Sequence, residues 1–121
     1  MDLLTYLRED LVRLMRRREK VALRAVRDAI SAIQNAETSY VTTPATVAPP
    51  SEFVAGGVRF GQAERVVRDL TDEQMMDLAR GEVTRRTEDA VRYRELGDVD
   101  RALMLKAEAL ALADRLDAYP G

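Results

Sequence analysis

Apolar residues recur every three or four positions in two long blocks of the chain, residues 2–37 and 71–118. This spacing is typical of helices that bury one face. The first block is interrupted by a polar run at residues 16–20, and the apolar repeat continues out of phase beyond it. A tight helical hairpin therefore competes with one helix of about 35 residues, and the hairpin is favoured because such a helix would be unusually long. The apolar positions on which this rests are Leu4, Leu7, Leu11, Leu14, Leu23, Val26, Ile30 and Ile33.

The second block begins and ends with residues that favour helix termini. Thr71 can cap a helix while Gln74 bonds back to it, Gly97 can end that helix in a left-handed conformation, and Asp98 or Asp100 can cap the last helix. The predicted inner faces are Met76, Ala79, Val83, Ala90 and Tyr93 (or Val91), then Ala102, Leu105, Ala109, Leu112 and Leu116. Acids on the first of these helices are interpreted as a solvated face, with weak surface pairs of Glu82 to Arg85 or Arg86 and of Glu88 to Arg92.

The connection between the blocks, residues 38–70, is 33 residues long, far beyond the ~4 to 6 that is usual. Its proline-rich first half, residues 42–51, is expected to be mobile. The second half contains Phe53 and Phe60 and is expected to fold back onto the helices, and residues 64–68 are expected to be extended. The sequence thus predicts one all-α domain over residues 1–121. It is an antiparallel bundle of four main helices, with hairpins at 1–37 and 71–118 and a long irregular insert containing proline and glycine.

The chain has no histidine and no cysteine, the side chains that most often act as nucleophile, proton carrier or transition-metal ligand. Amidase chemistry would need a serine with a lysine, but only Lys20 and Lys106 are present and neither accompanies a well-placed serine. The segment 56–61 lacks the residues of a phosphate-binding loop. We therefore expect no catalytic residues, cofactor or metal. We also expect a cytoplasmic protein, because no apolar run is long enough to span a membrane and no secretory signal is present.

Charge is distributed unevenly within a net charge of −2: residues 1–37 sum to +2 and residues 71–121 to −4. Around a hairpin turn, basic side chains at helical spacing would gather at one end of the bundle, where they could contact phosphates. The RNA-binding candidates are Arg13, Arg16, Arg17, Lys20 and Arg24. The alternative is a solvated face offset by nearby acids, namely Glu9, Asp10, Glu19 and Asp28, with few aromatic residues for base stacking.

Several segments, in their order and spacing, resemble the GatB/YqeY family. They are Leu23-Arg24-Ala25-Val26-Arg27, Ala32-Ile33-Gln34-Asn35-Ala36-Glu37, Leu70-Thr71-Asp72-Glu73-Gln74 and Glu82-Val83-Thr84-Arg85-Arg86, with Glu88, Tyr93, Gly97, Asp100, Ala102 and Glu108. The resemblance implies a helical domain related to the appendage of the GatB subunit of the tRNA-dependent amidotransferase, without catalytic residues of its own. The family label, carbon–nitrogen ligase activity with glutamine as amido-N-donor, belongs to the holoenzyme. Within the family motif, Arg27, Asn35 and Glu37 are expected to form a structural polar contact.

Two departures from the family pattern bear on function. The chain ends at Tyr119-Pro120-Gly121, where larger relatives continue into a small helical tail, and Asp98 stands where many members have a basic residue. Three hypotheses follow. The preferred one is a non-catalytic module associated with tRNA or a tRNA-dependent enzyme. The second is a module that forms a homodimer or binds a protein partner through apolar surface, and the third is an amidotransferase component with latent catalysis.

Overall fold

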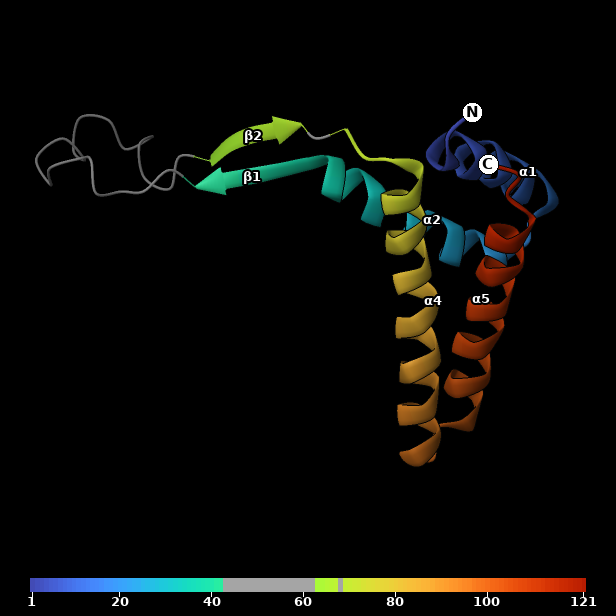
Figure 1. Ribbon diagram of the computed structural model, residues 1–121. Coiled ribbons are helices and arrows are strands. Elements are labelled where there is room, and N and C mark those ends of the chain that lie inside the picture. The colour runs from blue at the N-terminus through green and yellow to red at the C-terminus, as the bar shows by residue number, and fades with distance from the viewer. Residues whose placement is uncertain (43–62, 68) are drawn as a thin grey trace, which may run out of the picture. The chain divides into compact units, whose positions relative to one another are not determined.

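The computed structural model describes residues 1–42, 63–67 and 69–121. In chain order the elements are α1 (Leu3–Arg17), α2 (Lys20–Glu37), β1 (Thr38–Thr42), β2 (Ala63–Val67), α4 (Asp72–Glu95) and α5 (Val99–Ala118) (Figure 1). Four helices dominate this described part, which confirms the all-α prediction. The chain divides into two compact units. We call Met1–Gln34 with Leu70–Gly121 the bundle unit, and Asn35–Asp69 the hairpin unit.

The first block forms two helices, so the predicted hairpin is confirmed over a single long helix. Helix α1 ends at Arg17, and Arg18 adopts a left-handed conformation with φ of 55° and ψ of 37°. Its backbone N–H donates to the carbonyls of Leu14 and Met15, which closes the helix end. A left-handed conformation costs a residue with a Cβ roughly 1–2 kcal/mol, and here that conformation makes the turn from which α2 starts.

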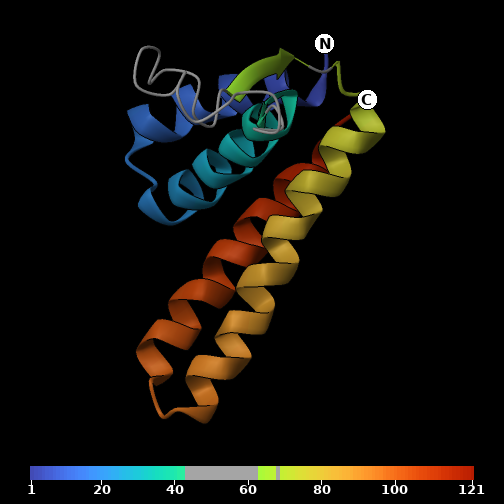
Figure 2. The same ribbon diagram turned by 90° about the vertical axis from the view of Figure 1, so that its left-hand side faces the viewer.

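The second block also forms a helical hairpin, and each predicted cap is confirmed. The Thr71 hydroxyl accepts from the N–H of Gln74, and the Gln74 side chain accepts from the N–H of Thr71. Gly97 has a φ of 86°, and the Asp98 carboxylate accepts from the N–H of Arg101 at 3.1 Å. Figures 1 and 2 show α4 and α5 side by side and antiparallel.

The core of the bundle unit gathers apolar residues from all four helices. The buried members are Leu3, Leu4, Leu7, Leu14, Ala22, Ala25, Val26, Ala29, Ile30, Ile33, Met75, Ala79, Leu112 and Leu116. The predicted inner face of α4 needs correction. Its buried residues are Met75, Ala79, Glu82, Arg86 and Ala90, whereas Met76 and Val83 are only partly buried and Val91 is exposed. The physical reason is that two charged residues, Glu82 and Arg86, lie on the buried face of α4. A prediction from apolar residues alone therefore selects a face of the helix that is rotated away from the buried one.

Asp72 joins the beginning of α1, the beginning of α4 and the segment after α5. One carboxylate oxygen accepts from the backbone N–H of Leu3 at 2.7 Å, and the other accepts from the Tyr119 hydroxyl. The Tyr119 ring also packs on Tyr6, with ring centroids 5.1 Å apart. The hydrogen bond to Asp72, together with burial, raises the pKa of Tyr119 to about 12.

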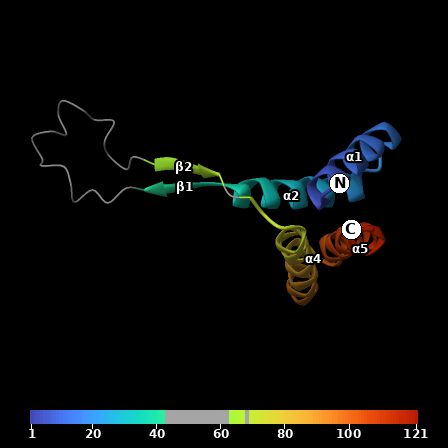
Figure 3. The same ribbon diagram turned by 45° about the horizontal axis from the view of Figure 1, so that its top comes forward.

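In the hairpin unit, β1 pairs antiparallel with β2, with Thr38 opposite Val67 and Thr42 opposite Ala63 (Figure 3). The extended conformation predicted at residues 64–68 is confirmed for 64–67. The strand at Thr38–Thr42 was not expected, although its β-branched and aromatic residues favour one. The expectations for residues 43–62, including the mobile segment and the packing of Phe53 and Phe60, lie outside the described residues. No helix among those described is both long and apolar enough to cross a membrane.

Candidate functional site

Four cationic side chains within five residues surround the turn between α1 and α2. Arg16 and Arg17 form the last turn of α1, Arg18 makes the turn, and Lys20 begins α2. All four side chains are exposed. We call these four residues the basic corner. Cations suit the negative end of the α1 dipole, so the corner has a structural reason to exist, but its exposure also leaves it available to an anionic ligand.

Three of the four acids that were expected to offset this charge, Asp10, Glu19 and Asp28, bind arginines of α4 or α5, whereas Glu9 is exposed and has no ion pair among the described residues. Arg115 of α5 donates from Nε to Asp10 Oδ2 at 2.6 Å and places Nη2 3.6 Å from Glu19 Oε2. Asp28 accepts from Arg86 of α4. Among the described residues, no member of the basic corner takes part in an ion pair.

The structure separates the five predicted RNA-binding candidates into two groups. Arg16, Arg17 and Lys20 lie together in the basic corner. Arg13 instead pairs with Asp10 at 3.2 Å, and the Arg24 guanidinium is 3.9 Å from Glu108 Oε2 of α5. Helical spacing indicates the other basic positions but passes over Arg18, because this residue lies in the turn. The signal that could have found it is its place in a run of three arginines at a predicted turn.

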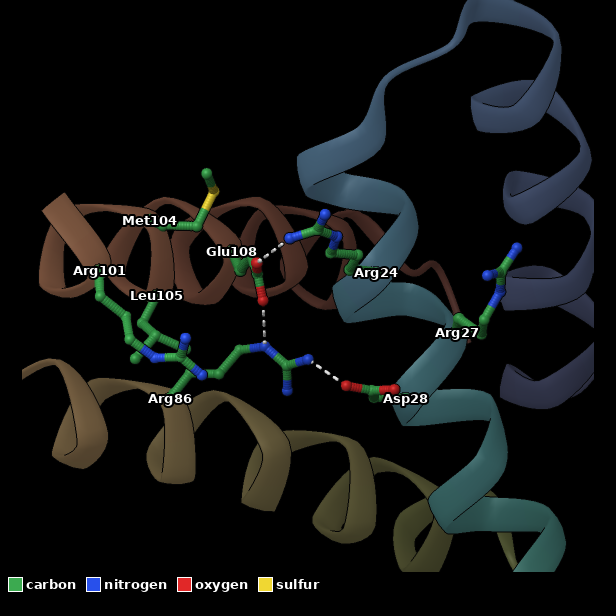
Figure 4. A pocket seen from close by; sticks show the side chains of 8 residues that line it. All are labelled: Arg24, Arg27, Asp28, Arg86, Arg101, Met104, Leu105 and Glu108. Atoms are coloured by element: carbon green, nitrogen blue, oxygen red, sulfur yellow. Dashed lines mark hydrogen bonds and ion pairs between the residues drawn. The ribbon is translucent and has the colours of Figure 1, made fainter.

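A second charged cluster, centred on Arg86, lies between α2, α4 and α5 (Figure 4). Arg86 donates from Nε to Glu108 at 3.0 Å, from Nη1 to Glu82 at 3.2 Å, and from Nη2 to Asp28. The side chains of Arg86, Glu82 and Glu108 are only 8%, 10% and 7% exposed. Burial acts to lower the pKa of Arg86, but the hydrogen bonds to Asp28 and Glu108 outweigh it and raise the pKa.

This cluster corrects the interpretation of Glu82 and its arginines as a solvated face. Arg85 does form the expected exposed pair with Glu82, at 3.3 Å. The pair with Arg86, however, is buried and belongs to a network that reaches two other helices. Arg92 pairs with Asp89 at 3.3 Å rather than with the predicted Glu88.

Beside the Arg86 cluster is a hollow of about 460 Å³ with exposed arginines around it. Arg24 is directed to Glu108, Arg27 points away from Arg86 (Figure 4), and the Arg101 guanidinium lies 4.8 Å from the ring centroid of Tyr93. Each of the three guanidinium nitrogens of Arg86 already donates to a carboxylate, so the cluster is suited to joining helices rather than to binding a ligand. Within the described ranges, no three histidine, cysteine or acidic side chains are grouped so that they could hold a metal ion.

The three residues of the predicted polar motif fall in different units. Arg27 is exposed on α2 in the bundle unit, whereas Asn35 and Glu37 belong to the hairpin unit. Asn35 is exposed and Glu37 is half-buried. The polar contact expected among them stays a prediction.

The basic corner is the strongest candidate for ligand contact, because its cations are exposed and the neighbouring acids Asp10 and Glu19 are bound by Arg115. The chemistry available there is electrostatic binding of anions, since arginine and lysine only donate hydrogen bonds. No family model, curated protein or solved structure matches the chain.

Proposed function

We propose that this protein is a non-catalytic helical module of the GatB/YqeY type that binds tRNA through the basic corner. The observation that carries the proposal is the set of four exposed cations, Arg16, Arg17, Arg18 and Lys20, whose neighbouring acids are held by Arg115. Contacts from arginine and lysine to phosphates supply most of the affinity of sequence-independent nucleic-acid binding. The resemblance to the family supplies the choice of tRNA.

The composition of the corner favours a folded RNA over an unpaired strand. Proteins that hold single-stranded RNA stack its bases on aromatic rings, and residues 16–20 contain none. A corner of four cations is suited instead to the phosphates of a double-stranded stem. We therefore expect binding that depends little on base sequence and strongly on salt.

The test is a titration of labelled bulk tRNA with the protein at two salt concentrations, followed by fluorescence anisotropy. The corner variant carries Arg16→Glu, Arg17→Glu and Lys20→Glu. The matched control carries Arg92→Glu, Arg94→Glu and Lys106→Glu, which changes the net charge equally at exposed positions on α4 and α5. Circular dichroism of each variant checks that the helices remain folded.

The wild type and the control should bind tRNA, with affinity that falls steeply as salt rises. Each phosphate contact contributes about 0.7–0.9 to the slope of log affinity against log salt, so the corner variant should lose a slope of roughly 2–3 together with most of its affinity. Equal loss in both variants would show that overall charge, not the corner, is responsible. No binding by the wild type at low salt would reject the RNA role and favour the alternative of a protein-interaction or oligomerisation module.

A further inference from the structure

A second surface, on the α4–α5 hairpin, has the form of a docking groove. The groove has a volume of about 440 Å³ and lies between the two helices near their connecting turn. Ala90 and Ala102 line it as small residues, and Val91, Val99 and Leu103 add larger apolar side chains that are 56%, 54% and 60% exposed. Figures 1 and 2 both show this end of the hairpin lying away from α1 and α2.

The exposed apolar residues of α5 form a stripe of their own. Val99, Leu103 and Leu110 follow one another at spacings of four and seven, which places them on one face of the helix. This stripe lies beside the line that α5 buries, because Ala102 and Ala109 precede Leu103 and Leu110 by one position. None of the three exposed residues belongs to the hydrophobic core. Helix α5 thus has more apolar surface than the bundle unit uses.

The charge of the groove selects among possible occupants. Its lining includes Arg94 and Lys106 and no acidic residue, although residues 71–121 as a whole carry a net charge of −4. In a two-fold symmetric contact, the same groove from a second copy would bring two more cations into the interface. Like charges buried together oppose association. The groove therefore fits an acidic partner better than another copy of itself.

We infer that this groove binds an amphipathic helix of a partner protein, with apolar residues on one face and glutamate or aspartate along its edges. Apolar side chains at positions i, i+3 or i+4, and i+7 of such a helix would fill the furrow over Ala90 and Ala102. Its flanking carboxylates would meet Arg94 and Lys106. This inference concerns a surface separate from the basic corner and does not depend on RNA binding.

Two designed peptides test it, each stapled so that it is helical in solution and each roughly five turns long. Both carry leucine at the apolar positions; one carries glutamate and the other lysine at the remaining positions. Binding of the labelled peptides is followed by anisotropy with the wild type, an Arg94→Glu/Lys106→Glu variant and a Leu103→Asp variant. An Arg16→Glu/Arg17→Glu variant serves as the control on the other surface.

The wild type and the corner control should prefer the glutamate peptide by about tenfold or more. The Arg94→Glu/Lys106→Glu variant should reverse that preference, and Leu103→Asp should lose both peptides. The inference is overturned if neither peptide binds the wild type, if both bind equally, or if the charge reversal changes nothing. It is also overturned if sedimentation shows a dimer that Leu103→Asp dissociates, because a second copy then fills the groove.

Discussion

Each nitrogen of the Arg86 guanidinium donates to a different carboxylate, Glu82 on its own helix, Glu108 on α5 and Asp28 on α2. Replacing Arg86 with methionine would keep much of its volume but remove the buried cation between Glu82 and Glu108, leaving them only the exposed Arg85 and Arg24. We expect Arg86→Met to lower the free energy of unfolding by about 3–5 kcal/mol. Urea denaturation followed by circular dichroism measures this change.

Arg85→Met is the matched control, because Arg85 also pairs with Glu82 but its side chain is exposed. Exposed pairs contribute about 0–1 kcal/mol, so this variant should be close to the wild type. If the two variants lowered the free energy of unfolding equally, burial of the Arg86 network would not be the reason that the network stabilises the protein.

Tyr119 gives a titration that can be followed directly. Its hydroxyl donates to Asp72, and this bond together with burial raises its pKa from 10 to about 12. The stabilisation from a raised pKa is fully present below the unfolded value and is lost as pH rises through the folded value. Absorbance of tyrosinate should therefore show one of the four tyrosines ionising near pH 12. That late step should be missing from Tyr119→Phe, and its persistence there would assign it to another tyrosine.

At the scale of the element, the beginning of α4 is set by the capping box at Thr71 and Gln74. Thr71→Ala removes the side-chain acceptor for the Gln74 N–H and should destabilise the protein by about 1 kcal/mol. Thr84→Ala is the control within the same helix. The Thr84 hydroxyl donates to the Arg80 carbonyl at 3.2 Å, and alanine is the better helix former there. Thermal unfolding should show a lower midpoint only for Thr71→Ala.

The ends of the helices could be predicted from sequence because caps are local. Thr71, Gly97 and Asp98 act through backbone groups a few residues away. The buried face of α4 was predicted only in part: Ala79 and Ala90 are buried as expected, but Glu82 and Arg86 stand on the same line, where apolar residues were expected. Glu108 holds a similar buried position on α5.

The candidate site also has a part that local sequence predicts and a part that it does not. The cluster at Arg16, Arg17 and Lys20 follows from adjacent sequence and a predicted turn. The availability of these cations depends on Arg115, which bonds Asp10 across 105 positions of the chain. Such a long-range pair leaves no local pattern in the sequence. The sequence alone therefore could not decide whether the basic side chains are free to bind an anionic ligand or are neutralised by the acids near them.

At the scale of the molecule, packing is unequal along the α4–α5 hairpin. The core cluster includes Met75 and Ala79 of α4 and Leu112 and Leu116 of α5, whereas the half near the turn adds only the small buried apolar residues Ala90 and Ala102. Amide hydrogens in residues 90–102 should therefore exchange at least about ten times faster than those around Ala79 and Leu112. Hydrogen exchange followed by mass spectrometry resolves these segments. Uniform protection along both helices would contradict this packing.

The Arg86 network has a consequence for how α2, α4 and α5 align. Small and apolar residues recur on nearly every turn of these helices, so a slip of one turn, about 5.4 Å along an axis, would exchange one apolar contact for a similar one. The guanidinium of Arg86 does not recur in this way. Its three donor nitrogens meet Glu82, Glu108 and Asp28 in a single alignment, and a slipped arrangement would leave buried charges unpaired. We therefore expect the network to select one register among several that bury similar apolar area.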